Sequence, residues 1–167
     1  MQFNTASLPV NQLVFTNEIL EVWKDEVTGQ HSTFSRINVP AGDIICDFGA
    51  SAIVQAPSYL TVQLNTNEHI YLQPSFLQYI NHSCNPNVFF DTTSFKVISL
   101  REIKTGDELC YFYPSTEWKM DQPFQCVCNC DNCLGYINGA SYLTEDVLQG
   151  YRFSDFISQQ LKIKYSK

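Results

Sequence analysis

The chain has 167 residues, a formal net charge of −7 and a hydrophobic content of 44%. A chain of this length usually makes one domain around one core. No apolar run reaches the ~20 residues that a membrane helix needs. No Lys or Arg lies between Arg36 and Lys96, so no basic stripe is visible that would neutralise phosphates. We therefore expect no membrane partner and no direct nucleic-acid partner.

The first ten residues, Met1 to Val10, have no basic residue ahead of an apolar stretch, so we do not expect a secretory signal. From this we expect an intracellular protein, cytoplasmic or nuclear. An acidic surface of this kind can attract a lysine-rich substrate, although many cytosolic proteins are acidic without such a role.

Short strand-like runs dominate the chain as far as Pro114, so we predict a mainly β (α+β) fold. Pro74 is placed to open one helical turn that runs toward Tyr79. Turns are expected at 27–30, 39–43, 91–94 and 104–107. The predicted strands are 13–15, 19–23, 44–48, 59–64, 69–72, 88–90, 95–100 and 108–113.

The chain changes character after Pro114. Residues 121–139 are rich in Cys, Asn, Asp and Gly and show little periodicity, so they need an added constraint to hold one shape. Further on, Thr144 and Ser154 can each cap a helix. Lys162 and Lys164 follow at the end of the second one, where cations complement the helix dipole. We therefore expect a helical tail.

Four of the seven cysteines lie between positions 126 and 133. That spacing is too tight for a disulfide framework, and we interpret it as reduced thiolates gathered for a metal. Cys126, Cys128 and Cys133 have the spacing C-x-C-x4-C, and structural zinc prefers four thiolates. Cys130 forms a second metal-like pair with Cys133, so the choice of ligands stays open by one residue.

Three segments, taken together in their order and spacing, resemble the SET-domain family of lysine methyltransferases. They are Asn81-His82-Ser83-Cys84-Asn85-Pro86-Asn87, then Gly106-Asp107-Glu108-Leu109-Cys110-Tyr111-Phe112-Tyr113, and then the cysteine-rich run that ends at Gly135. The resemblance covers roughly residues 35–140 and includes the post-SET cysteine motif. Residues 114–124 are similar to small stand-alone SET proteins of microbes.

This resemblance implies a SET-type β-clip-like fold of short sheets with a knot-like crossing, a zinc-bound post-SET tail and a C-terminal helix. It divides the chain into a SET domain (1–120), a post-SET zinc-binding segment (121–139) and a C-terminal helical tail (140–167). In the family, the Cys of the Asn-His-Ser-Cys segment supplies the fourth zinc ligand. The implied four-cysteine site for one structural Zn²⁺ is Cys84, Cys126, Cys128 and Cys133.

The resemblance also implies a site for S-adenosylmethionine. Asn81 and His82 take the positions that bind the amino acid moiety and the adenine of this cofactor. Trp118 and Phe124 are candidates to pack on the adenine face, although a buried aromatic is more often core. The family's Gly-x-Gly segment, whose backbone approaches the cofactor, corresponds here to Gln30, His31 and Ser32.

Tyr113 matches the tyrosine that lines the methyl-transfer channel, so it is the expected catalytic residue. Tyr111 stands where the family has Phe or Tyr, a choice that influences how many methyl groups fit. Methyl transfer from a sulfonium to an amine is an in-line displacement, for which alignment carries much of the rate. An apolar channel beside the sulfonium lowers the pKa of the substrate amine, and we expect no strong general base.

The leading hypothesis is therefore an S-adenosylmethionine-dependent methyltransferase of the protein-lysine type, with a protein or peptide lysine as substrate. One alternative is a SET scaffold used in small-molecule biosynthesis with an apolar substrate. That enzyme would be a metabolite methyltransferase, or a cyclase that retains S-adenosylmethionine as a structural element. A third hypothesis is a non-catalytic binding module, because a fold does not fix a function.

Overall fold

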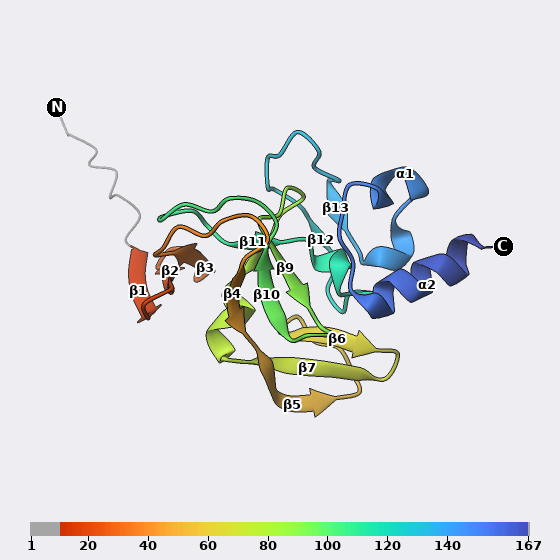
Figure 1. Ribbon diagram of the computed structural model, residues 1–167, viewed down its shortest axis with the longest axis horizontal. Coiled ribbons are helices and arrows are strands. Elements are labelled where there is room, and N and C mark those ends of the chain that lie inside the picture. The colour runs from red at the N-terminus through yellow and green to blue at the C-terminus, as the bar shows by residue number, and fades with distance from the viewer. Residues whose placement is uncertain (1–10, 167) are drawn as a thin grey trace.

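The computed structural model describes residues 11–166. The expectation that Met1 to Val10 are not a secretory signal concerns residues outside this range. The described chain is built mainly of short strands, with its two α-helices near the C-terminus (Figure 1). The first sheet has the strand order β1 (Asn11–Thr16), β2 (Leu20–Asp25) and β3 (His31–Ser35). The second has the order β4 (Ile44–Asp47), β10 (Lys96–Ser99) and β9 (Val88–Asp91). The third has the order β5 (Gly49–Val54), β7 (Glu68–Gln73) and β6 (Thr61–Asn65).

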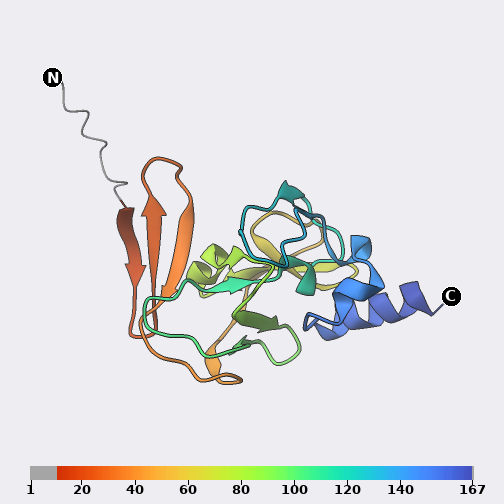
Figure 2. The same ribbon diagram turned by 90° about the horizontal axis from the view of Figure 1, so that it is seen from above.

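The sheet of β1, β2 and β3 lies at the opposite end of the molecule from the C-terminal helix (Figure 2). Leu20 and Val22 alternate on β2 and are buried in the core, as expected for a half-buried strand. The turn after β2 is held by the Asp25 side chain, which accepts hydrogen bonds from Val27 N (2.7 Å) and Thr28 N (2.9 Å). This turn places the start of β3 beside the site described below.

The main core is formed by side chains from all three of these sheets. Phe90 and Val97 face each other across the β9–β10 pair, and both are fully buried. Ile70 on β7 pairs with Val62 on β6, and these two side chains are also buried. Burying one such side chain stabilises the fold by about 1.5–3 kcal/mol. Apolar burial therefore fixes the register of both sheets.

Two strands from distant parts of the chain cross beneath this core. β8 (Asn81–His82) pairs in parallel with β11 (Cys110–Tyr111). The Asn87 side chain secures the crossing, because it donates to Glu108 O and accepts from Cys110 N, both at 2.8 Å. Backbone hydrogen bonds from Ser83 N to Tyr111 O (3.1 Å) and from Asn87 N to Cys110 O (3.0 Å) also hold the knot-like crossing.

The strand predicted at 108–113 is shorter in the structure. It ends at Tyr111, and a 3-10 helix, η2 (Tyr113–Ser115), follows at once. Pro114 is the physical reason, because its ring fixes φ and it has no N–H to donate to a ladder. The predicted turn after Pro74 is confirmed as the 3-10 helix η1 (Ser75–Tyr79).

The C-terminal part packs on a second small core. β12 (Phe124–Gln125) pairs with β13 (Tyr136–Ile137), and η3 (Ala140–Tyr142), α1 (Glu145–Leu148) and α2 (Asp155–Tyr165) follow. Ser154 caps α2 by accepting a hydrogen bond from Ile157 N at 3.3 Å. Thr144 is the N-cap residue of α1, as predicted, but its side chain makes no capping hydrogen bond.

The mainly β fold class, with a cysteine-rich segment and a C-terminal helix, is confirmed. None of the helices described between residues 11 and 166 has the length and apolarity needed to cross a membrane.

Candidate active site

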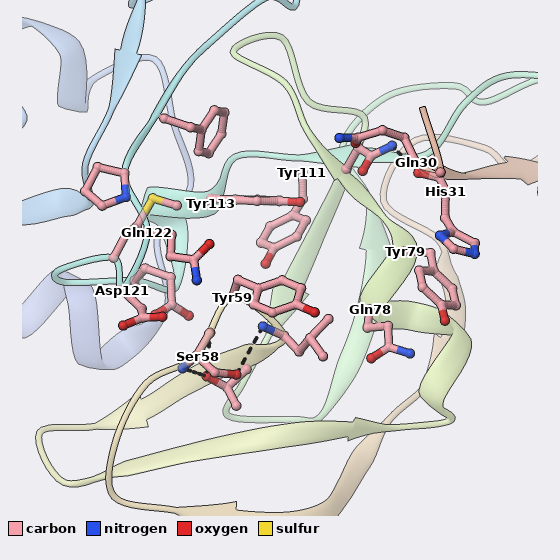
Figure 3. A pocket seen from close by; sticks show the side chains of 18 of the residues that line it. Gln30, His31, Ser58, Tyr59, Gln78, Tyr79, Tyr111, Tyr113, Asp121 and Gln122 are labelled. Atoms are coloured by element: carbon pink, nitrogen blue, oxygen red, sulfur yellow. Dashed lines mark hydrogen bonds between the residues drawn. The ribbon is translucent and has the colours of Figure 1, made fainter. Parts of the chain in front are cut away.

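A cavity of about 660 Å³ opens where the crossing meets the β2–β3 turn and the segment before β12. Tyr111 and Tyr113 lie at its centre, with Gln30 and His31 on one side and Asp121 and Gln122 on the other (Figure 3). Of the residues predicted from the sequence, the cavity brings together Gln30, His31, Asn81, Tyr111, Tyr113 and Phe124.

Tyr113 is held in the cavity wall by its neighbours. Its ring lies 4.6 Å from the ring of Tyr111 and 5.2 Å from that of His82, measured between centroids. Its hydroxyl donates to the carbonyl oxygen of Ile80 at 3.3 Å. Burial raises the pKa of both tyrosines, so both phenols keep their protons at neutral pH. The site therefore presents neutral hydroxyl groups.

Asn81 and His82 hold the crossing to the rest of the site. The Asn81 amide donates to His31 O (2.8 Å), Ser32 Oγ (3.1 Å) and Glu108 Oε1 (3.1 Å). The Nδ1 atom of His82 accepts from the backbone N–H of Tyr113 at 3.3 Å. Burial lowers the pKa of His82 to about 4, so its ring is neutral.

The three residues at the positions of the family's Gly-x-Gly segment are placed differently from one another. Gln30 and His31 line the cavity, and the His31 ring stacks on Tyr79 with centroids 4.3 Å apart. Ser32 is not among the lining residues and instead bonds Asn81. The extended backbone of β3 explains how this segment runs past the cavity without glycine.

Trp118 and Phe124 are separated by the fold. Phe124 lines the large cavity, with its ring 5.5 Å from His82 and 6.0 Å from Tyr113. Trp118 packs against the second core and lines another cavity, together with Gln63 and Phe156. Of the two candidates for an adenine face, the structure thus places Phe124 at the cavity and Trp118 away from it.

Sequence reasoning missed Glu117, a carboxyl group in the wall of the large cavity. It is 7% exposed, and its Oε1 atom accepts a hydrogen bond from Gln63 N at 2.9 Å. Its Oε2 atom lies 4.0 Å from Nδ1 of His69. Burial raises the pKa of Glu117 to about 8. No pattern in the sequence around Glu117 indicates this role, because the burial that creates it is a property of the fold.

The sulfur atoms of Cys84, Cys126, Cys128 and Cys133 lie within 4.8 Å of one another. Four thiols at this separation form the donor set that a tetrahedral Zn²⁺ takes, so the residues present fit that ion. Burial acts to raise the pKa of Cys128, but hydrogen bonds to Cys130 and Cys84 lower it to about 6, which favours the thiolate.

Cys130 lies outside the group of four. Its sulfur is 3.4 Å from Ser83 Oγ and 3.5 Å from the carbonyl oxygen of Cys128. The Cys84 end of the cluster is tied to the C-terminal part, because Asn132 Nδ2 (2.6 Å) and Tyr151 OH (2.8 Å) both donate to the Cys84 carbonyl oxygen. The cluster therefore joins the crossing to the tail.

Comparison with known proteins gives the following similarities. The SET domain family model matches residues 5–114. Methyltransferase flvH of Aspergillus flavus is 37% identical over 146 residues, which are 86% of this chain and 82% of that protein. A variant-silencing SET domain-containing protein of Plasmodium falciparum is 27% identical over 143 residues, 70% of this chain and 6% of that protein.

An H3 lysine-36 specific histone-lysine N-methyltransferase of Chaetomium globosum is 34% identical over 68 residues, 37% of this chain. The present chain thus spans most of the Aspergillus flavus protein. It spans less than a tenth of the Plasmodium and Chaetomium proteins, at 6% and 8% of their lengths.

Proposed function

Because the chain belongs to the SET-domain family, we propose that it is an S-adenosylmethionine-dependent methyltransferase that methylates an amine nitrogen, in the first place the side chain of a protein lysine. The similarity to histone-lysine N-methyltransferases supports a lysine as acceptor. Bound S-adenosylmethionine supplies the electrophilic methyl group, and the residues of the cavity bind and align the reactants.

The observation that carries this proposal is the contact made at the crossing by Tyr113. Tyr113 and Asn81 line the large cavity, and the Tyr113 hydroxyl donates to the carbonyl oxygen of Ile80, which is buried behind that wall. Carbonyl and hydroxyl oxygens can hold a methyl group in line through weak C–H···O contacts. In our proposal Asn81 and His82 position the cofactor, Phe124 packs against it, and Tyr113 orients the acceptor amine.

We also propose that Cys84, Cys126, Cys128 and Cys133 bind one structural Zn²⁺. Such an ion fixes the post-SET segment (121–139) to the SET domain (1–120), while the helical tail (140–167) packs behind it. Because metal binding and folding are linked, the ion stabilises the wall that contains Phe124.

A small amine metabolite is a second candidate acceptor. The methyltransferase of Aspergillus flavus resembles this chain over most of both lengths, whereas the histone-lysine N-methyltransferase of Chaetomium globosum matches only 37% of it. The mouth of the cavity also carries the exposed Tyr59, Asp121 and Gln122, a polar rim open to a free amine.

The test is an assay of S-adenosylhomocysteine release by zinc-loaded protein. Histones and lysine peptides are compared with free lysine and short alkyl diamines. Tyr113→Phe should lower kcat by about 10²–10³-fold with each acceptor, since it removes one preorganised donor. Tyr136→Phe is the matched control because that ring is 57% exposed on β13, outside the cavity. Absence of S-adenosylmethionine binding by calorimetry would refute the proposed function.

A further inference from the structure

A buried carboxyl–imidazole pair lies between two cavities. Glu117 lines the large cavity together with Tyr111 and Tyr113. His69, on β7, lines a second cavity of about 280 Å³ with Trp118 and Gln160. Glu117 Oε2 and His69 Nδ1 are 4.0 Å apart, and the two residues are 7% and 4% exposed. The pair therefore places two titratable side chains side by side between the large cavity and the second cavity.

The carboxyl group is positioned from one side only. Its Oε1 atom accepts the hydrogen bond from Gln63 N at 2.9 Å. Gln63 is itself fixed, because its side-chain oxygen accepts from Trp118 N at 2.9 Å and its amide donates to Asn65 O at 3.0 Å. The Thr116 side chain also lies near enough to the carboxyl to act against the rise of its pKa. No hydrogen bond to the Oε2 atom is formed within residues 11–166, so this atom is available to a donor in the cavity.

The imidazole is not explained by a structural role. Its Nδ1 atom is buried without a hydrogen-bond partner in the described part of the chain, which costs free energy. No Lys or Arg forms an ion pair with Glu117 among the described residues. The other charged or titratable groups that line the two cavities are His31, Tyr59, Tyr79, Tyr111, Tyr113 and Asp121 with Glu117 in the large one, and Lys119 with His69 in the second.

We propose that Glu117 is a catalytic residue, which accepts the proton that a substrate ammonium must lose before methyl transfer, and that His69 takes this proton out toward the second cavity. The inference rests on the proposed function and names its substrate class: an alkylammonium whose cationic nitrogen enters between Glu117 and Tyr113.

The steps balance as follows. An N–H bond of the ammonium breaks, and an O–H bond forms on Glu117 Oε2. The freed lone pair of the amine then forms the N–C bond as the methyl C–S bond breaks, and S-adenosylhomocysteine is released. The proton passes from Oε2 to Nδ1 of neutral His69 as the two side chains close their 4.0 Å gap. The imidazolium then loses its other N–H proton to water.

The electrostatics of the site support this role. Burial raises the pKa of Glu117 to about 8, close to the pH at which a general base is most effective. Burial also lowers the pKa of His69, so its ring is neutral before the transfer and holds the proton only briefly before water takes it. A cation beside Glu117 stabilises the carboxylate, and the arrival of the substrate thereby produces the base that it needs.

The kinetic test compares the pH dependence of kcat/KM for wild type and Glu117→Gln, in zinc-loaded protein with a saturating methyl donor. Wild type should rise with pH and level off near pH 8. Glu117→Gln keeps an acceptor for Gln63 N, and its kcat/KM at pH 7 should fall by about 10²–10³-fold. Its profile should keep rising toward the pKa of a free lysine amine, about 10.4.

Matched variants separate the two members of the pair. Glu68→Gln makes the same chemical change on the exposed end of β7 and should match wild type. His69→Phe keeps a ring but removes the exit for the proton, so kcat should fall while kcat/KM still levels off near pH 8. A Glu117→Gln profile identical to that of wild type would overturn the inference.

A second readout does not require turnover. In wild type labelled with ¹³C at the Glu carboxyl carbons and bound to S-adenosylhomocysteine, one resonance should titrate near pH 8. Addition of n-butylammonium should move that titration to lower pH, and n-butanol should not. A shift without methyl transfer would support the inference and count against the proposed function. Methyl transfer without a shift of the titration would support the proposed function and overturn the role of Glu117.

Discussion

Glu117→Gln should change how the stability of the fold depends on pH. Burial raises the pKa of Glu117 from its ordinary value of 4.5 to about 8, so the folded chain keeps a proton that the unfolded chain has lost. The stability that this neutral carboxyl contributes is fully present below pH 4.5 and is lost as the pH rises through 8. At about 1.36 kcal/mol per pKa unit, the full loss is ~5 kcal/mol.

The glutamine variant has no proton to lose at this position and keeps the hydrogen bond from Gln63 N. The difference in unfolding free energy, variant minus wild type, should therefore rise between pH 5 and pH 9 by ~4 kcal/mol, since part of the full change lies below pH 5. Urea denaturation of the zinc-loaded proteins at a series of pH values measures this difference. Glu68→Gln, whose carboxyl is exposed, should show no such trend. A difference that stays constant with pH would refute the reasoning.

Two further predictions concern the tail. Cys133→Ser should abolish the binding of one zinc ion per chain, measured by metal analysis, and should speed proteolysis within 121–139. Cys130→Ser should leave the zinc content and the proteolysis rate unchanged, because the Cys130 sulfur lies outside the group of four. Gly139→Ala should lower the unfolding midpoint more than Gly42→Ala. Both glycines have positive φ, which costs about 1–2 kcal/mol for alanine, but only at Gly139 would the new Cβ lie 2.7 Å from the Trp118 carbonyl oxygen. Equal losses at the two glycines would contradict the steric argument.

Strands with a clear apolar pattern could be predicted from the sequence. The runs at 69–72 and 88–90 fall inside β7 and β9, where Ile70 and Phe90 are fully buried. Strand β3 could not be predicted, because His31–Ser35 is polar and gains its shape from pairing with β2. The same holds for β12 and β13, two-residue strands that pair only because the tail folds back.

The candidate site likewise has residues that could be predicted from the sequence and residues that could not. The Asn-His-Ser-Cys segment and the three downstream cysteines carry a spacing that indicates their chemistry, and the structure gathers Cys84 with those cysteines. Glu117 carries no such signal, because its importance comes from burial beside His69, a residue 48 positions earlier in the chain. A base made by desolvation is visible only once the surrounding wall has been built.

The placement of Phe124 links the cavity to sulfur chemistry. This side chain forms part of the cavity wall and stands two residues before Cys126, whose sulfur lies among the four gathered thiols. Oxidation of these thiols, or removal of their metal by a chelator, would release β12 and with it the part of the cavity wall that Phe124 forms, without altering Tyr113 or Asn81. With the proposed zinc site, a preparation that loses activity through oxidation in air should regain it when a thiol reductant and Zn²⁺ are added.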